Sequence, residues 1–220
     1  MRLILIRHGQ TPANVDGVLE STVPGPGLTK LGEQEAAALP VTLAHEDIGA
    51  IFTSTQVRSQ ITAGPLAQAK GLSTEVRDGL REIDSGDLEG HTARESVIRY
   101  VSTFLSWIDG DLDVRMPGAE NGHEVLRRYD EVIAEVEALG HGTVAFVSHG
   151  AIIRAWVGTR TVDVDAEFFR TNYVANTGYA VLHGSTAEGW RLESWQGGGI
   201  FDPALVIPED DSPAALTTDA

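Results

Sequence analysis

Short, uninterrupted apolar runs are the most distinct feature of the hydrophobic pattern along the chain. Residues 3–6 read LILI, residues 143–147 read TVAFV, and residues 50–53 form a third such run. Runs of this length without polar alternation are typical of strands that are buried on both faces of a sheet. Weaker strand patterns cover residues 73–76, 177–183 and 190–195. We therefore predict six strands.

Helical periodicity separates these runs. The clearest helix is predicted over residues 121–139, where Asn121 and Glu124 form a capping-box pattern and Gly140 follows the last apolar position. Further helices are predicted over 29–44, 56–70, 93–108 and 151–157, with Pro40 and Pro65 disturbing the first two. Residues 11–27 are rich in proline and glycine, so we expect a loop there.

The alternation of strands with helices predicts the fold class. It favours an α/β protein, a three-layer α/β/α sandwich with a mostly parallel central sheet and an antiparallel edge strand formed late in the chain. We expect a single domain over residues 1–202. The last residues, 203–220, read PALVIPEDDSPAALTTDA, and this acidic segment is expected to be a mobile tail.

Composition narrows the function classes. The chain has 220 residues and a formal net charge of -16, which argues against nucleic-acid and membrane-surface partners because both require a basic patch. It contains no cysteine, which excludes disulfides, thiolate catalysis and cysteine-bound zinc. The N-terminal apolar run is too short for a signal segment, so we expect a cytoplasmic protein. A homodimer is compatible with the sequence, which carries no signal for or against it.

Two of the predicted strands end in the same way, on a histidine followed by a glycine. The first run continues into Arg7, His8 and Gly9, and the run at 143–147 continues into Ser148, His149 and Gly150. In open parallel sheets the carboxyl ends of the strands form the edge where ligands bind. The two imidazoles and the guanidinium are therefore expected to share one crevice. Arg58, at the start of a predicted helix, and Glu82, in a loop, could reach the same edge.

These segments resemble the histidine phosphatase superfamily, the phosphoglycerate-mutase-like family. The resemblance rests on RHGQT, on the run from Ser54 to Ala63, on LREIDSGDLEG and on SHG, which occur in the family's order within residues 1–195. It implies a phosphatase-type enzyme with His8 as the nucleophile and Glu82 as the proton donor. It also implies a catalytic phosphate pocket of Arg7, Arg58 and His149, with Asn14 and Gly150 as further phosphate contacts.

The chemistry of these residue types fits phosphoryl transfer. Arginines can clamp the three phosphoryl oxygens, on which negative charge spreads in the transition state, and a neutral imidazole can attack the phosphorus. The clamp does the work of a metal, so no cofactor is expected. The remaining histidines show no metal-binding spacing, so no metal site is expected; they are His45, His91, His123, His141 and His183. The sequence leaves the protonation state of Glu82 open.

The predicted function is a metal-independent phosphomonoesterase that hydrolyses small phosphorylated metabolites through a phosphohistidine. One alternative is a cofactor-dependent phosphoglycerate mutase. Glu82 is followed by Ile83, Asp84 and Ser85, and few basic residues follow before Gly118, which weakens that alternative. A second alternative is a non-catalytic phospho-ligand-binding protein. Apolar residues around the predicted pocket favour a substrate with one phosphate and a neutral or apolar leaving group.

Overall fold

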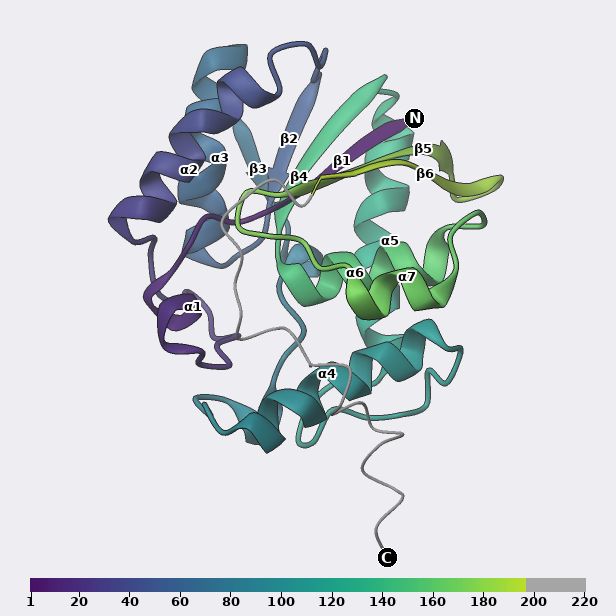
Figure 1. Ribbon diagram of the computed structural model, residues 1–220. Coiled ribbons are helices and arrows are strands. Elements are labelled where there is room, and N and C mark those ends of the chain that lie inside the picture. The colour runs from purple at the N-terminus through teal and green to yellow at the C-terminus, as the bar shows by residue number, and fades with distance from the viewer. Residues whose placement is uncertain (197–220) are drawn as a thin grey trace, which may run out of the picture.

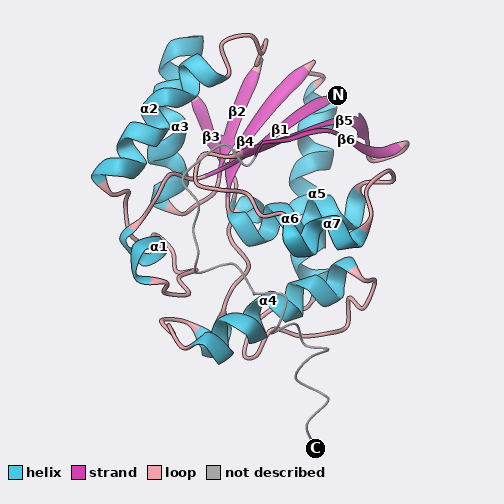
Figure 2. Ribbon diagram, viewed as in Figure 1, coloured by secondary structure: helices cyan, strands magenta, loops and turns pink. Residues whose placement is uncertain are grey.

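A six-stranded sheet forms the centre of the computed structural model, which describes residues 1–196 (Figures 1 and 2). The strand order is β3-β2-β4-β1-β5-β6. The strands are β1 (Arg2–Arg7), β2 (Ala50–Thr53), β3 (Thr74–Val76), β4 (Thr143–Ser148), β5 (Tyr179–Ser185) and β6 (Gly189–Gln196). The first four strands are parallel to one another. β5 pairs antiparallel with β1, β6 pairs antiparallel with β5, and these two strands form one edge of the sheet.

Helices cover both faces of this sheet. They are α1 (Pro12–Asp16), α2 (Lys30–Thr42), α3 (Val57–Lys70), α4 (Arg94–Ile108), α5 (Gly122–Leu139), α6 (Gly150–Arg160) and α7 (Ala166–Thr171). Short 3-10 turns η1 (Asp78–Leu80) and η2 (Gly86–Leu88) follow β3. Helices α2 and α3 lie on one face, and α5 and α6 lie on the other (Figure 1).

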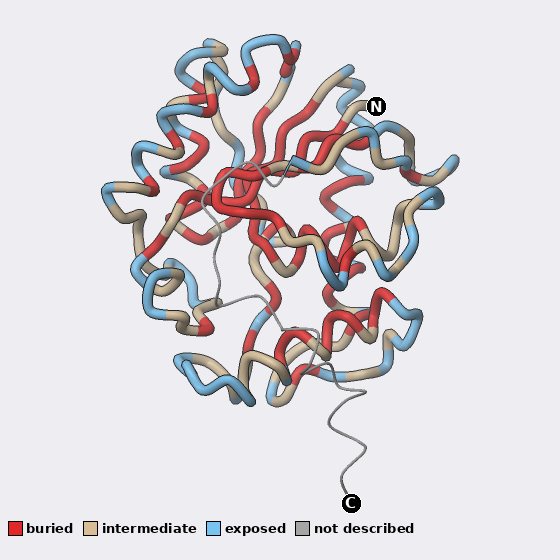
Figure 3. The backbone as a smooth tube through the Cα atoms, in the orientation of Figure 1, coloured by how far each residue is buried: buried red, intermediate tan, exposed pale blue. Residues whose placement is uncertain are grey.

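Alternate residues of β1 pack into the two separate cores. Leu3 and Leu5 belong to the larger core, to which α4, α5 and α6 contribute, whereas Ile4 and Ile6 belong to the smaller core beside α2 and α3. All four side chains are buried, and the strands form the buried centre of the molecule (Figure 3). The continuous apolar run thus results from a strand covered on both faces.

The predicted sandwich architecture, strands and long helices are confirmed, with ends shifted by at most three residues. The antiparallel edge contains two strands. Two expectations are wrong. Residues 11–27 are not all loop, because α1 lies within them, and α7 was not predicted at all. The tail at 203–220 lies outside the described residues, so the predicted division into domain and tail stays a prediction.

No helix within residues 1–196 is both long enough and apolar enough to span a membrane.

Candidate active site

The carboxyl ends of β1 and β4 bring two histidines together. The strands are paired in parallel register from Arg2 with Thr143 to Arg7 with Ser148, so the next residue of each, His8 and His149, leaves the sheet at the same level. Their rings lie 5.1 Å apart between centroids, at an angle of 56°. The side-by-side placement expected from the two matching strand ends is therefore observed.

His8 is buried and has one ring nitrogen fixed by the backbone. Its Nδ1 lies 2.8 Å from the carbonyl oxygen of Gly9, which can only accept, so Nδ1 carries the proton and Nε2 carries the lone pair. Burial holds the pKa of His8 well below its usual value, and the charges of Arg58 and Arg7 lower it further. The ring is thus neutral, with a nucleophilic nitrogen left over.

Arg7 lies directly beneath the start of α6. Its Nη1 donates to the carbonyl oxygen of Val174 at 2.9 Å, and the residue is only 2 % exposed. A Cβ atom on Gly150 would lie 3.2 Å from the Arg7 Nε and 3.3 Å from its Cδ. Because Gly150 has no side chain, α6 can begin in contact with the Arg7 guanidinium. A glycine directly after His149 is consistent with such a close approach.

His149 uses both ring nitrogens on protein partners. Its Nδ1 accepts from the Arg58 Nε at 3.3 Å, so its Nε2 carries the proton and donates to the Ser54 hydroxyl at 2.7 Å. Burial, followed by the charge of Arg58, lowers the pKa of His149 well below its usual value. The neutral His149 ring is not part of the pocket lining, and it orients Arg58 by accepting a hydrogen bond from its Nε.

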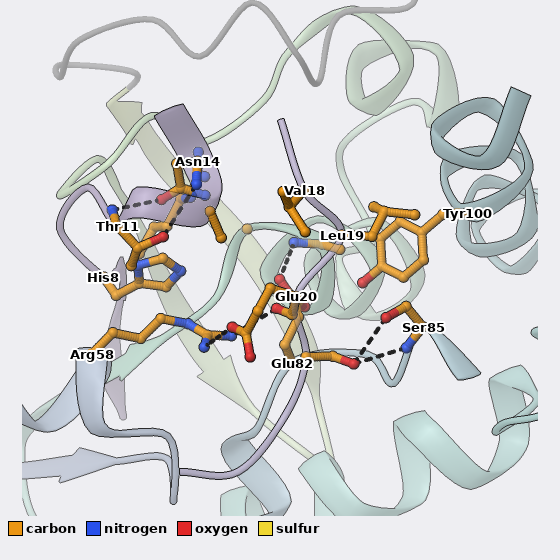
Figure 4. A pocket seen from close by; sticks show the side chains of 15 residues that line it. His8, Thr11, Asn14, Val18, Leu19, Glu20, Arg58, Glu82, Ser85 and Tyr100 are labelled. Atoms are coloured by element: carbon orange, nitrogen blue, oxygen red, sulfur yellow. Dashed lines mark hydrogen bonds and ion pairs between the residues drawn. The ribbon is translucent and has the colours of Figure 1, made fainter. Parts of the chain in front are cut away.

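The Glu20 carboxylate forms an ion pair with Arg58. Oε2 of Glu20 is 2.5 Å from the Arg58 Nη1, and the backbone carbonyl of Glu20 accepts from Nη2 at 3.1 Å. The dashed line in Figure 4 marks this pair, in which Arg58 is buried and Glu20 is partly exposed to the pocket. This contact could not be predicted from the sequence, because Glu20 lies 38 positions before Arg58 in a segment predicted to be loop.

Glu82 lies at the N-terminus of α6. Its Oε2 accepts from the backbone N–H of Ala151 at 3.1 Å, and its Oε1 accepts from those of Ile152 and Ile83, both at 2.9 Å. The first N–H groups of a helix have no partner within the helix and suit a carboxylate. The side chain is thereby directed into the pocket next to the strand ends (Figure 4).

The backbone of Glu82 is held by two side chains from elsewhere in the chain. Its N–H donates to Oε1 of Gln56 at 2.9 Å, and its carbonyl accepts from Nη2 of Arg128 at 3.0 Å. Arg128 also donates to the carbonyls of Gly79 and Arg81, and its charge is paired with Glu120 at 3.0 Å. Glu120 therefore anchors the loop through Arg128.

Asn14 is turned toward the pocket by the first helix. It is the third residue of α1, and its Oδ1 accepts from the Thr11 backbone N–H at 3.1 Å, completing a capping box. The same oxygen accepts from Nδ2 of Asn176 at 3.2 Å, and that group also donates to the His8 carbonyl at 3.0 Å. Both contacts occupy the Asn14 oxygen, which leaves its amide NH₂ group for a ligand.

Six of the seven residues selected from the sequence line one pocket, and His149 supports it from behind. The pocket-lining six are Arg7, His8, Asn14, Arg58, Glu82 and Gly150. Glu20, Ser85 and Tyr100 also line it (Figure 4), and the sequence analysis did not select them. Ser21 is a further lining residue that it did not select. Within residues 1–196, no group of three or more histidine or acidic side chains is placed to hold a metal ion.

Two curated proteins are similar to this chain over more than four fifths of its length. The chain is 33% identical to a PE-PGRS family protein of Mycobacterium tuberculosis over 87% of its own length, but it spans only 36% of that protein. It is 29% identical to phosphoserine phosphatase 1 of Hydrogenobacter thermophilus, covering 83% of this chain and 86% of that one.

A similar solved structure is a mycobacterial glucosyl-3-phosphoglycerate phosphatase in complex with VO3. It shares 28% identity and a TM-score of 0.74, and the match covers 89% of this chain and 98% of that one. The sequence model of the histidine phosphatase superfamily (branch 1) matches residues 3–197. A match over nearly the whole chain places this protein in the histidine phosphatase superfamily.

Proposed function

We propose that the protein is a metal-independent phosphomonoesterase that hydrolyses small phosphorylated metabolites through a phosphohistidine on His8. The observation that carries this proposal is the state of His8. It is neutral, its Nδ1–H is fixed on the Gly9 carbonyl, and its Nε2 lone pair lies in a pocket with Arg7 and Arg58. Membership in a superfamily whose relatives include named phosphatases supports a hydrolase.

In the first step, the His8 Nε2 attacks the phosphorus while the bond between phosphorus and the ester oxygen breaks. Arg7, Arg58 and the Asn14 amide hold the phosphoryl oxygens, on which charge develops. Glu82 enters this step protonated and gives its proton to the departing oxygen, so the alcohol leaves neutral. The Nδ1–H bond to Gly9 stays in place and stabilises the positive charge that the phosphorylated ring acquires.

In the second step, water attacks the phosphohistidine. The Glu82 carboxylate takes a proton from this water, the bond between nitrogen and phosphorus breaks, and inorganic phosphate leaves with its charge held by the arginines. His8 returns to its neutral form. We assign His149 to the phosphate pocket as the residue that orients Arg58, since both of its nitrogens already have partners.

The nucleophile is tested by replacing His8 with alanine. Turnover should fall by more than about a thousandfold, because the covalent path is lost, while vanadate should still bind through Arg7 and Arg58. Rapid quenching of the wild type with substrate should trap a phosphoenzyme that is stable in base and labile in acid. An acid-stable phosphoenzyme, or an active His8→Ala variant, would show that another residue is the nucleophile.

The mutase alternative is separated by product analysis. The wild type is incubated with 3-phosphoglycerate and a trace of its bisphosphate, with EDTA present. We expect free phosphate and little 2-phosphoglycerate, because the pocket has no second cluster of arginines beside Glu82 among its lining residues. Predominant isomerisation would favour the mutase, and loss of activity in EDTA would mean that the arginine clamp does not replace a metal. Vanadate binding without any phosphoryl transfer would favour the non-catalytic binding protein.

A further inference from the structure

Arg154 is a buried cation for which the proposed mechanism has no use. It lies on α6 one helical turn after Gly150 and is only 5 % exposed. One terminal nitrogen, Nη2, donates to the carbonyl oxygen of Phe169, and the guanidinium carbon lies 5.2 Å from the ring centre of Phe104. Both partners are neutral.

No carboxylate in the described part of the chain pairs with Arg154, and its Nε has no hydrogen-bond partner there. Two other buried arginines differ in this respect, since Arg58 is paired with Glu20 and Arg128 with Glu120. A buried charge without a counter-ion is costly, and a buried N–H group without an acceptor adds to that cost. Burial, together with the charge of Arg7, lowers the pKa of Arg154 to about 10, so it remains charged at neutral pH.

The guanidinium lines a hollow that adjoins the phosphate pocket. Tyr100, Gly150 and Ala151 line both spaces, so the two hollows lie side by side at the first turn of α6. The rest of the hollow is largely apolar, with Val101 and Val174 among its walls. An anionic group in this hollow would meet one cation in surroundings of low polarity, where a charge-assisted hydrogen bond is strong.

We propose that this hollow is a second anion subsite, in which Arg154 binds the carboxylate of a substrate whose phosphate lies against His8. The inference rests on the proposed phosphatase function and adds a substrate class to it, the phosphate monoesters of small hydroxy acids. A carboxylate fits better than a second phosphate, because a single planar guanidinium matches one carboxylate in charge and in fork geometry. The substrate class differs from the neutral leaving group that the sequence favoured.

The test compares two substrates that differ only in the carboxylate. They are 3-phosphoglycerate and glycerol 3-phosphate, and the measured quantity is the ratio of their kcat/KM values. In the wild type, 3-phosphoglycerate should be preferred by about tenfold or more, the usual effect of one charge-assisted hydrogen bond. Arg154→Gln should reduce the ratio by about tenfold, and Arg154→Lys, which keeps the charge, should restore part of it.

Arg160→Gln is the matched control. It removes an arginine from the same helix at its far end, where Arg160 pairs with Asp130. This control should leave the ratio unchanged. A wild type without preference for the carboxylated substrate overturns the subsite, whether or not the Arg154 variants fold. An unchanged ratio in a folded Arg154→Gln protein overturns it as well.

Binding measurements keep this proposal separate from the proposed function. The same substrate ratio, taken as dissociation constants by calorimetry in the His8→Ala background, does not depend on turnover. Selective binding of 3-phosphoglycerate without phosphate release by the wild type would keep the subsite and reject the phosphatase. Phosphate release from both substrates, with a ratio that Arg154→Gln does not alter, would keep the phosphatase and reject the subsite.

Discussion

Glu20 places a negative charge on the arginine that a substrate phosphate would need. Its carboxylate is 2.5 Å from the Arg58 Nη1, and it also accepts from the Thr22 backbone N–H at 3.0 Å. A bound phosphate would therefore lie close to a second anion, because both would approach the same guanidinium. Glu20 orients Arg58, and its charge should at the same time weaken the binding of phosphate.

Glu20→Gln should consequently bind phosphate more tightly. The amide keeps an oxygen for Arg58 but carries no charge, so the dissociation constant for inorganic phosphate should fall by about tenfold, or about 1.4 kcal/mol. Isothermal titration calorimetry measures this change. Glu188→Gln, an exposed carboxylate at the turn between β5 and β6, is the control and should have no effect. Weaker binding in Glu20→Gln would mean that orienting Arg58 outweighs the repulsion.

The sequence analysis selected more of the residues that line the pocket than of those that position them. Arg7, His8 and His149 were found because matching strand ends place them at one edge of the sheet. Arg128 and Asn176 were missed, although each holds the backbone of a candidate catalytic residue. Their partners are 46 and 168 positions away, and neither residue lies in a distinctive local pattern. Such contacts depend on tertiary structure, which a single sequence does not encode locally.

At the scale of elements, the N-terminus of α6 is where the candidate groups converge. Its first N–H groups bind Glu82, and the absence of a side chain on Gly150 makes room for Arg7. A Cβ at position 150 would have three atoms of the Arg7 side chain within 3.5 Å. Either the helix or the guanidinium would have to shift by a few tenths of an ångström.

Gly150→Ala should therefore impair catalysis more than folding. We expect kcat/KM to fall by about tenfold to a hundredfold, since small displacements of a positioning group are costly in the transition state. The melting temperature should change little. Gly64→Ala in α3 is the control, because a Cβ there meets nothing within 4 Å. Full activity should be retained in that variant, with equal or higher stability. Full activity in Gly150→Ala would mean that Arg7 adjusts without loss.

Element prediction failed where helices are short and lack an apolar stripe. Helix α1 has five residues and buries none of them, so no periodicity marks it. Its signals are the Thr11 cap and Pro12 in the first turn, which the surrounding prolines and glycines obscured. Helix α7 buries only Phe169. The long helices and the strands were predictable because burial on a sheet imposes a strong pattern over many residues.

At the scale of the whole molecule, an acidic protein encloses a site in which buried arginines stay charged and buried histidines stay unprotonated. The chain has a formal net charge of -16, yet four arginines and two neutral histidines are buried at or beside one site; the arginines are Arg7, Arg58, Arg128 and Arg154. Burial is the main cause that lowers the pKa of both histidines, and the charges of the neighbouring arginines lower it further. The unfolded chain has neither influence, so its histidines keep a pKa of about 6.5.

On acidification, the free energy of unfolding should therefore begin to fall at a higher pH than the titration of carboxylates would cause. Below about pH 6.5 the unfolded chain binds two protons that the folded protein excludes, so the free energy of unfolding falls by up to about 1.4 kcal/mol per histidine for each pH unit. Urea denaturation between about pH 6.5 and 5.5 measures this slope. His149→Gln should roughly halve it, whereas His183→Gln, which removes an exposed histidine, should leave it unchanged. A flat profile in the wild type would mean that His8 and His149 take up protons inside the folded protein, which is incompatible with a neutral His8 as the resting nucleophile.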